Sequence, residues 1–382
     1  MSIILLSRFI ERYLYEKKVM FFLEHLEGGG AEKVAVDVLN KIDKKKYNIT
    51  LVLLFGMGVN IKNLDQEINV KTIVKKPFGR IGNKIVFNFM KYMPELFYKL
   101  FMPKESHIEV AFLEGFATKI ISYSTNKESK KIAWVHTDLS QNRWTTYAYK
   151  RNEEISCYRK FDDVVFVSKD AYLGFDKVFN VDNINKHIVY NPIIIENIIT
   201  KSKEREISYN EFTIVSVGRL VNIKGFDRLI KAHAKLVGRF PHSLVIIGEG
   251  EERRNLEQLV NTLGVNGSVD IMGFIENPYP YIKAANLFVS ASKTEGYGVA
   301  VAEAILLEKP VMITNITGTL EILGDKENGV VCENSQEGIE KGLEYILQNK
   351  NLLQYYEKKS RERRSFFQYN TRINEIEEIF DK

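Results

Sequence analysis

The residues with the clearest capacity for chemistry lie in one glycine-rich segment, 294–303, which reads TEGYGVAVAE. Glu295 follows a predicted strand, and Glu303 lies in a helix that we expect to begin near Gly298. Unpaired amides at the start of a helix attract an anion, and carboxylates accept hydrogen bonds from hydroxyl groups. The segment therefore predicts a site for a ligand that carries both phosphate and polyol groups. The alternative is structural: Glu303 caps or solvates its helix, and Glu295 is an ordinary loop carboxylate.

A second candidate is the turn 218–225, which reads GRLVNIKG and directly follows a predicted strand. Arg219 stands at the end of that strand, and Lys224 stands five residues later, near the start of the next helix. Two cations in this arrangement could bind a diphosphate without a metal ion. A pair of surface charges is the alternative.

Two further glycine turns follow predicted strands. Gly28-Gly29-Gly30 precedes a helical stretch, where it would let the backbone approach a phosphate closely; a tight turn without a ligand is the alternative. Gly248-Glu249-Gly250 has Arg253 where a third fingerprint glycine would stand, and its acidic residues disfavour a phosphate. Neither GxGxxG nor GxxxxGK[ST] occurs, so neither the dinucleotide fingerprint nor the P-loop is supported.

These turns fit a repeated order of strand, turn and helix. Nearly continuous apolar strands that alternate with helices predict parallel sheets covered on both faces, and ligands bind such sheets at the carboxyl ends of the strands. The expected strands form two series, which predicts two Rossmann-like domains: Val19–Leu23, Ile49–Phe55, Ile108–Leu113, Lys131–Val135, Asp163–Val167 and His187–Val189, then Phe212–Val217, Ser243–Ile247, Val269–Ile271, Leu287–Ser290, Val311–Thr314 and Gly329–Cys332.

The expected organisation is an N-terminal extension (1–18), a first domain (19–195), a second domain (196–355) and a C-terminal helix (356–382). The first series of strands ends near Tyr190-Asn191-Pro192, and a polar stretch precedes the next one. A charged helix is expected from Leu352 to Phe380. Apolar residues spaced for one helical face make residues 1–18 a candidate interfacial helix or packing extension; translation from an upstream start codon is the third alternative.

Composition excludes several classes of protein. The 382 residues are 45% hydrophobic and 27% charged, as in globular proteins, and the formal net charge of +5 is too small for a dedicated nucleic-acid binder. Two cysteines provide no disulfide framework and no CxxC motif. No run approaches the roughly 18 apolar residues of a spanning helix. The charge is unevenly distributed: residues 1–195 carry +8 and residues 196–382 carry −3.

Taken together, the motifs resemble a known family. Glu295 and Glu303 enclose seven residues, and with the 218–225 turn they are similar to the signature of the family 4 retaining glycosyltransferases (glycosyl transferases group 1), of the bacterial surface-polysaccharide type. The resemblance runs from about Val19 to the C-terminal helix and is densest from 212 to 323. It implies the GT-B fold: two doubly wound Rossmann-like domains whose parallel sheets face across a cleft, with the C-terminal helix crossing back to the first domain.

The resemblance also implies roles for individual residues. Arg219 and Lys224 would stabilise the leaving diphosphate. Glu303 would accept the ribose hydroxyls, and Glu295 would hold hydroxyls of the donor sugar. His136, which follows the strand of the Trp134–Asp138 stretch, would contact the donor sugar; a merely structural histidine is the alternative. We therefore expect His136, Arg219, Lys224 and Glu295 to be catalytic, and further donor contacts at Gly29, Gly30, Gly218, Gly296, Tyr297, Gly298 and Val299.

The implied reaction moves a hexose-type sugar from a UDP- or GDP-sugar to a hydroxyl of a saccharide acceptor, with retained anomeric configuration. The acceptor would be lipid-linked, in the synthesis of a capsule, exopolysaccharide or other cell-surface glycan. The chain has no Asp-x-Asp motif, so we expect no metal and no other cofactor. A nucleotide-sugar epimerase on the same fold and a non-catalytic GT-B partner subunit are the alternatives.

The first domain has a candidate membrane surface in residues 71–104, where eight Lys or Arg residues and one Glu give a net charge of +7, interleaved with seven aromatic residues. Such a mixture suits anionic headgroups. The hypothesis is that the segment docks on a membrane and presents a lipid-linked acceptor. The protein would then be cytoplasmic, or peripheral at the inner face of the plasma membrane. The alternative is that the aromatics are core and the lysines merely solvated.

Overall fold

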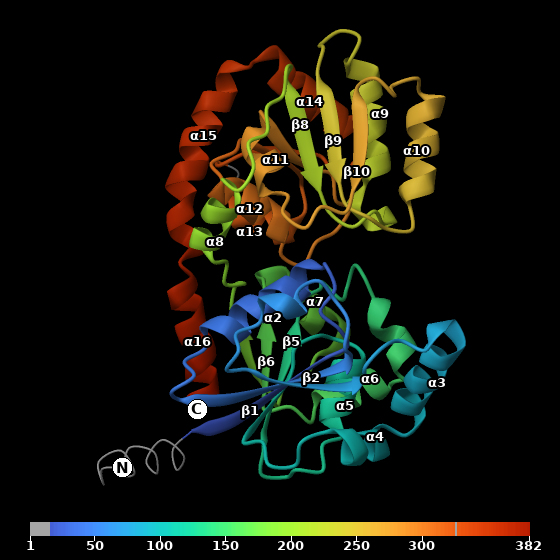
Figure 1. The fold of residues 1–382 in the computed structure, drawn as a ribbon, viewed down its shortest axis with the longest axis vertical. Helices are drawn as coiled ribbons and strands as arrows, with labels where there is room; N and C mark the ends of the chain where they lie inside the picture. The colour runs from blue at the N-terminus through green and yellow to red at the C-terminus, as the bar shows by residue number, and fades with distance from the viewer. Residues whose placement is uncertain (1–15, 325–326) are drawn as a thin grey trace. The chain divides into compact units, whose positions relative to one another are not determined.

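The computed structural model describes residues 16–324 and 327–382, which fold as two units. Unit 1 comprises the chain up to Pro192 together with Asn370–Lys382, and unit 2 comprises Ile193–Tyr369 (Figure 1). Residues 1–15 of the expected N-terminal extension lie outside the described residues. Lys17 and Lys18, also assigned to that extension, belong to the first strand.

Unit 1 is built on a seven-stranded parallel sheet in the order β3-β2-β1-β4-β5-β6-β7. This order places β4 between β1 and β5, so the loops that follow these three strands lie at one edge of the sheet. The strands are β1 (Lys17–Leu23), β2 (Tyr47–Phe55), β3 (Asn69–Val74), β4 (Ile108–Ala111), β5 (Lys130–Val135), β6 (Asp163–Phe166) and β7 (Asn185–Ile188).

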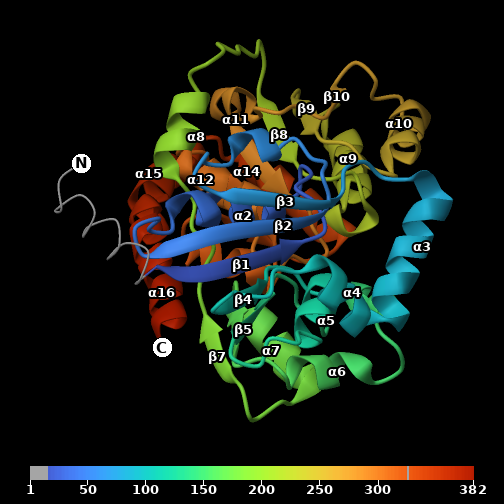
Figure 2. The same cartoon turned by 60° about the horizontal axis from the view of Figure 1, so that its bottom comes forward.

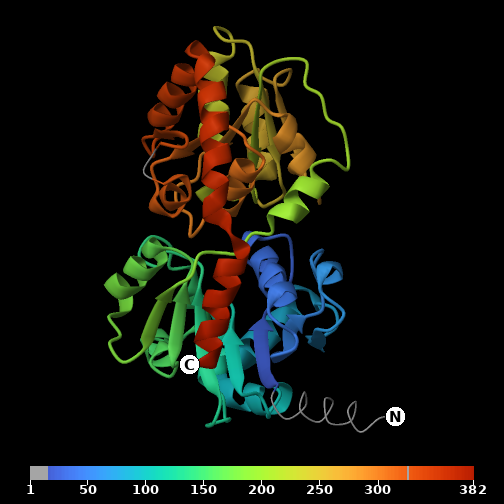
Figure 3. The same ribbon diagram turned by 90° about the vertical axis from the view of Figure 1, so that its left-hand side faces the viewer.

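Both faces of this sheet are covered, because successive side chains of a strand point to opposite faces. Met20 and Phe22 of β1 belong to the core beneath α3 to α7, whereas Phe21 contacts Phe380 of α16. Figure 2 shows α4 and α5 opposite α2, and Figure 3 shows α16 in red along the sheet of unit 1. The helices are α2 (Gly30–Lys41), α3 (Gly79–Tyr92), α4 (Pro94–Phe101), α5 (Phe116–Ser122), α6 (Glu153–Tyr158), α7 (Lys169–Phe179) and α16 (Tyr369–Asp381), with 3-10 turns η1 (Ile61–Asn63) and η2 (Trp144–Ala148).

Unit 2 has a six-stranded parallel sheet in the order β10-β9-β8-β11-β12-β13. β8 pairs directly with β11, so the two loops that carry the predicted cations and carboxylate are neighbours. The strands are β8 (Thr213–Val217), β9 (Ser243–Ile247), β10 (Val269–Gly273), β11 (Leu287–Ser290), β12 (Val311–Thr314) and β13 (Val330–Cys332).

Helices also cover both faces of the second sheet. Ile214 and Ile246 pack with α9, α10 and α14 in one core, and α12 contacts β11 and β12. The helices are α8 (Ile195–Lys201), α9 (Phe226–Leu236), α10 (Arg253–Thr262), α11 (Tyr279–Ala284), α12 (Val299–Leu306), α13 (Thr317–Leu323), α14 (Gln336–Gln348) and α15 (Asn351–Arg363), with η3 (Asn222–Lys224) and η4 (Arg364–Phe367). The expected pair of parallel-sheet domains is confirmed.

Two local expectations are wrong. The sequence does not predict β3, because this edge strand exposes its first four residues and lacks an apolar pattern. The single helix expected from Leu352 to Phe380 is divided: α15 ends at Arg363, the 3-10 turn η4 follows, and α16 begins at Tyr369. Burial of Phe367, followed by the extended backbone of Gln368, interrupts the helix.

Candidate active site

Lys224 and Glu295, 71 residues apart in the sequence, meet at the carboxyl edge of the unit 2 sheet. The Lys224 Nζ donates a hydrogen bond to Glu295 Oε1, and Ser292 Oγ donates to the same oxygen at 2.8 Å. Their side chains are only 21% and 15% exposed. A partly desolvated ion pair of this kind retains electrostatic strength that a fully exposed pair loses to water. The sequence analysis predicts that both groups bind one ligand, and their direct contact is compatible with that prediction.

The two loops are held together by backbone contacts. Gly225 has φ +66°, and a Cβ at this position would lie 2.1 Å from the Ala291 carbonyl oxygen, so only glycine fits. The amide of Lys293 donates to the Ile223 carbonyl at 2.7 Å, and Lys293 Nζ donates to Asn222 Oδ1 at 2.7 Å. The spacing of Lys224 and Glu295 is therefore set by the chain itself.

The Arg219 side chain is exposed and, within the described part of the chain, its guanidinium makes no hydrogen bond or ion pair. The backbone beneath it is braced: Gly218 N donates to the Ile247 carbonyl at 3.0 Å, and Leu220 N donates to the Glu249 carbonyl at 2.8 Å. A Cβ on Gly248 would lie 1.9 Å from the Gly218 oxygen. The Gly248-Glu249-Gly250 turn thus supports the loop that carries Arg219.

The segment after Glu295 leads into α12, as the sequence predicts. Gly298 has φ +52° and is the N-cap of the eight-residue helix, whose first amides have no acceptor inside the helix. Gly296 and Val299 are partly exposed, whereas the Tyr297 ring is buried. A Cβ on Gly318 would lie 2.3 Å from the Glu295 carbonyl oxygen, so α13 fixes this loop from the other side.

Glu303 lies in the middle of α12. Its side chain is 6% exposed, and Oε1 accepts a hydrogen bond from the Tyr279 hydroxyl at 3.0 Å. The structure thus gives the predicted ribose-binding carboxylate a fixed orientation. Tyr279 had no signal in the sequence, because it lies 24 residues away in a different helix.

In unit 1, Gly29 and Gly30 form the start of α2, where Gly29 is the N-cap. The Glu32 carboxylate folds back onto this turn: a Cβ on Gly29 would lie 2.0 Å from Glu32 Oε2. A carboxylate is favourable at the positive end of a helix. An anionic ligand at Gly29 would therefore compete with the Glu32 carboxylate for the same positive end.

His136 follows β5 and is neutral over the physiological range, because burial lowers its pKa to about 3. A hydrogen bond with the backbone of Phe112 partly opposes this shift. The ring nitrogen that makes this hydrogen bond therefore carries the proton. The other nitrogen, Nε2, is buried and has no hydrogen-bond partner among the described residues. On a neutral ring this nitrogen is an acceptor, suited to a ligand hydroxyl.

Glu114 is the functional candidate that the sequence analysis missed. It is fully buried after β4, and Oε1 accepts a hydrogen bond from the His136 amide at 2.8 Å. Burial raises the pKa of this carboxyl to about 7, against hydrogen bonds that favour its charged form. The second oxygen, Oε2, has no partner in the described structure. The rule that sites lie at the carboxyl ends of strands would have identified Glu114, which directly follows a predicted strand.

The described residues contain no group of three or more His, Cys, Asp or Glu that could hold a metal ion. Cys157 and Cys332 are buried, and burial raises the pKa of each thiol to about 11, so neither is an activated nucleophile.

The basic segment 71–104 contains most of β3 and all of α3 and α4. We call its exposed aromatic and aliphatic residues the α3–α4 surface. Its aromatics are divided between core and surface: Phe97 and Tyr98 are buried, Phe87 and Phe89 pack against the core, and Phe78, Tyr92 and Phe101 are 67%, 59% and 42% exposed. Five aliphatic residues are also exposed: Ile81, Ile85, Met93, Leu96 and Leu100. None of the helices in the described ranges has the length and apolar character needed to cross a bilayer.

Comparison with known proteins agrees with this geometry. Residues 197–363 match the family model "Glycosyl transferases group 1". The chain is 32% identical over 368 residues to the Campylobacter jejuni N-acetylgalactosamine-N,N'-diacetylbacillosaminyl-diphospho-undecaprenol 4-alpha-N-acetylgalactosaminyltransferase, covering 92% of this chain and 96% of that protein. It is 27% identical over 351 residues to an uncharacterized Haemophilus influenzae glycosyltransferase, covering 90% and 94%.

The fold is shared with solved structures. Anabaena Alr3699/HepE, crystallised in complex with UDP and glucose, superimposes with a TM-score of 0.76 at 18% identity, over 96% of this chain and all of that one. This similarity identifies the two-unit α/β architecture as GT-B.

Proposed function

The chain belongs to the glycosyl transferases group 1 family, and we propose that it transfers a hexose-type sugar from a UDP- or GDP-sugar to a hydroxyl of a lipid-linked saccharide, with retained anomeric configuration, in the synthesis of a cell-surface glycan. The observation that carries the proposal is the Lys224–Glu295 pair at the joined β8 and β11 loops, beside the start of α12. These loops supply a cation, a carboxylate and helix amides, which are the groups that a nucleotide-sugar requires.

In the proposed step, the bond between the sugar C1 and the diphosphate oxygen breaks, and a bond forms between C1 and the acceptor oxygen on the same face. The acceptor proton passes to the departing phosphate. Arg219 and Lys224 stabilise the negative charge that develops on this phosphate, together with the amides of Gly296 to Val299. Glu295 and Glu303 accept hydrogen bonds from the hydroxyls of the donor sugar and the ribose. The step uses no metal ion, which activity measured with and without a chelator will test.

The residues proposed in unit 1 are Gly29, Gly30 and His136. The glycine turn would contact the donor phosphates through its backbone amides. The neutral His136 ring would accept a hydrogen bond from a donor hydroxyl through Nε2, the buried nitrogen without a partner in the described chain. A neutral acceptor is suited to a hydroxyl and places no extra charge beside the sugar.

The lipid-linked acceptor is supported by the Campylobacter relative, whose name places its substrate on diphospho-undecaprenol. The α3–α4 surface supports it independently, because exposed apolar side chains of two consecutive helices stand among the basic residues of the segment. The one acidic residue there, Glu95, is paired with Lys99. We infer that this surface docks on an anionic bilayer.

Flotation with liposomes containing anionic lipid tests the docking. The double variant Ile81→Ser, Ile85→Ser should float less than the wild type, and so should Lys75→Glu, Lys76→Glu. Leu173→Ser is the matched control, because Leu173 is a 59% exposed apolar residue on α7 of the same unit. Equal flotation of all four proteins would contradict the docking.

The transferase itself is tested by measuring binding and turnover of UDP- and GDP-sugars for the wild type, Glu295→Ala and Arg219→Ala. Arg254→Ala is the control, an exposed arginine on α10 of the same unit. Removing a charge-stabilising donor should lower the rate by about 10²–10³-fold. Unchanged turnover in Glu295→Ala and Arg219→Ala would refute the proposed site.

A further inference from the structure

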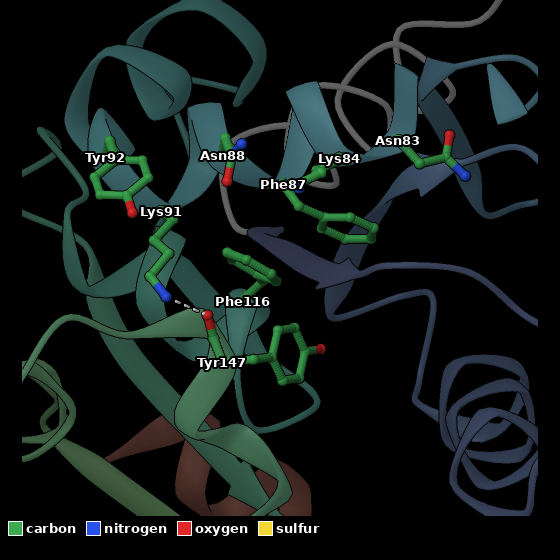
Figure 4. A pocket seen from close by; sticks show the side chains of 8 residues that line it. All are labelled: Asn83, Lys84, Phe87, Asn88, Lys91, Tyr92, Phe116 and Tyr147. Atoms are coloured by element: carbon green, nitrogen blue, oxygen red, sulfur yellow. Dashed lines mark hydrogen bonds between the residues drawn. The ribbon is translucent and has the colours of Figure 1, made fainter. Parts of the chain in front are cut away.

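A groove in unit 1 is not used by the proposed donor site. It encloses about 450 Å³ between α3, the start of α5 and η2 (Figure 4). Aromatic rings and amide side chains line it. The lining residues are Asn83, Lys84, Phe87, Asn88, Lys91, Tyr92, Phe116 and Tyr147.

The aromatic lining comes from three separate elements. Phe87 of α3 stacks on Phe116 of α5 with 5.2 Å between ring centroids, and Tyr147 of η2 meets Phe116 edge-on at 5.4 Å. Tyr147 is nevertheless 48% exposed, so much of its ring remains accessible. Sugar rings present apolar C–H faces that pack on aromatic rings, and amides such as Asn83 and Asn88 can both donate to and accept from hydroxyls.

The walls of the groove are fixed by a buried lysine. Lys119 is 0% exposed, and its Nζ donates to the Lys91 carbonyl of α3 at 2.7 Å, to the Ala148 carbonyl of η2 at 3.1 Å and to Glu153 at 2.8 Å. Lys91 Nζ donates in turn to the Tyr147 carbonyl at 2.8 Å. A buried ammonium is costly unless its donors are satisfied, and here its bonds join both walls. The groove is therefore preformed.

The groove adjoins the carboxyl edge of the unit 1 sheet. Phe116 directly follows Gly115, and a Cβ on Gly115 would lie 3.6 Å from the Trp144 ring. Trp144 Nε1 donates to Thr137, the neighbour of His136, at 3.2 Å. Phe116 and Trp144 thus connect the groove to the loop that carries His136, the proposed reaction-centre residue of this unit.

The opposite border of the groove is the α3–α4 surface. Tyr92 of α3 lines the groove and is also one of the exposed residues of that surface, and at 100° per residue Ile81 and Ile85 lie on the same side of the helix as Tyr92. The apolar surface and the groove therefore adjoin along α3.

We propose that this groove binds a sugar residue of the acceptor, with Tyr147 and Phe116 as its stacking platform and Asn88 as a hydroxyl partner. The inference rests on the proposed transferase function and adds to it the acceptor subsite. A lipid-linked saccharide would lay its sugar in the groove while its lipid stays at the α3–α4 surface.

Saturation-transfer NMR on the protein with bound UDP tests the subsite. It measures binding of the methyl glycosides of glucose, galactose, N-acetylglucosamine and N-acetylgalactosamine, and of decyl phosphate. At least one glycoside should receive saturation from the protein, and its affinity should fall about tenfold in Tyr147→Ala and in Asn88→Ala. Tyr355→Ala, which removes a 50% exposed tyrosine of unit 2, is the matched control and should bind like the wild type.

Saturation of none of the glycosides, or equal binding by Tyr147→Ala, Asn88→Ala and Tyr355→Ala, would overturn the subsite. Saturation of the decyl chain alone would overturn it in favour of a lipid groove. Hydrolysis of the nucleotide-sugar without acceptor separates this result from the wider proposal. A wild type that hydrolyses a donor but binds no glycoside refutes the subsite alone, whereas a wild type that neither binds nor hydrolyses any donor refutes the transferase itself.

Discussion

Replacing Glu114 by glutamine keeps the size of the side chain behind His136 and removes its titration. The carboxyl is 0% exposed, and burial raises its pKa from 4.5 to about 7. Glutamine can still accept the hydrogen bond that Oε1 receives from the His136 amide. The comparison with the wild type therefore isolates the part of the free energy of unfolding that depends on protonation of Glu114.

The raised pKa of Glu114 sets the direction in which stability changes with pH. Between pH 4.5 and 7 the unfolded chain has lost the Glu114 proton while the folded protein still holds it, so the stability of the wild type falls as the pH rises. A shift of about 2.5 units corresponds to about 3 kcal/mol. Because Glu114→Gln has no such proton, its free energy of unfolding should gain about 3 kcal/mol relative to the wild type between pH 4.5 and pH 8.

Urea unfolding followed by tryptophan fluorescence measures this difference. The only two tryptophans, Trp134 and Trp144, both lie in unit 1, so the signal reports on the unit that contains Glu114. Effects of the substitution that do not depend on pH cancel between the two conditions. Exposed Glu128→Gln is the control on the same unit. Parallel pH profiles of wild type and Glu114→Gln would refute the reasoning.

We expect three other outcomes. Lys224→Met should lower kcat by about 10²–10³-fold, because the departing phosphate loses a cation, and kcat equal to the wild type would exclude this role. Gly225→Ala should lower the melting temperature by several degrees, since its Cβ would lie 2.1 Å from the Ala291 oxygen at a positive φ; Gly238→Ala, which has open space, should not, and equal melting temperatures would contradict the packing. Burial lowers the pKa of His233 to about 3, so the unfolded chain binds a proton below pH 6.5 that the folded protein excludes. Stability should therefore fall as the pH drops from 6.5 toward 3, less so in His233→Gln, and an unchanged pH dependence in that variant would contradict the assignment.

Much of the fold could be predicted because parallel strands buried on both faces are short runs of apolar residues. β9 and β11 match their predicted bounds for this reason. β3 carries no such pattern, because an edge strand has one neighbour and exposes its side chains. The break between α15 and α16 depends on where Phe367 is buried, which the local sequence does not encode.

The candidate site divides in the same way. Glu295 and Lys224 could be identified because each stands in a turn that directly follows a strand. Their pairing could not, since it depends on β8 lying beside β11. The groove is harder still to predict, because Phe87, Phe116 and Tyr147 come from three elements. Nothing in the local sequence distinguishes Lys119 from a surface lysine. The fold shows that it is buried and donates to three oxygen acceptors.

The position of α16 has a consequence for synthesis of the chain. Phe380 packs on Phe21 and Tyr47, with ring centroids 6.2 and 5.5 Å away, and its carbonyl accepts a hydrogen bond from Lys17 Nζ at 3.1 Å. Residues of β1 and β2 are thus covered by a helix that is translated after all of unit 2. While the ribosome translates unit 2, the part of the unit 1 sheet that α16 covers stays open to water and to chaperones. Folding of the first unit is completed only after the second has left the ribosome.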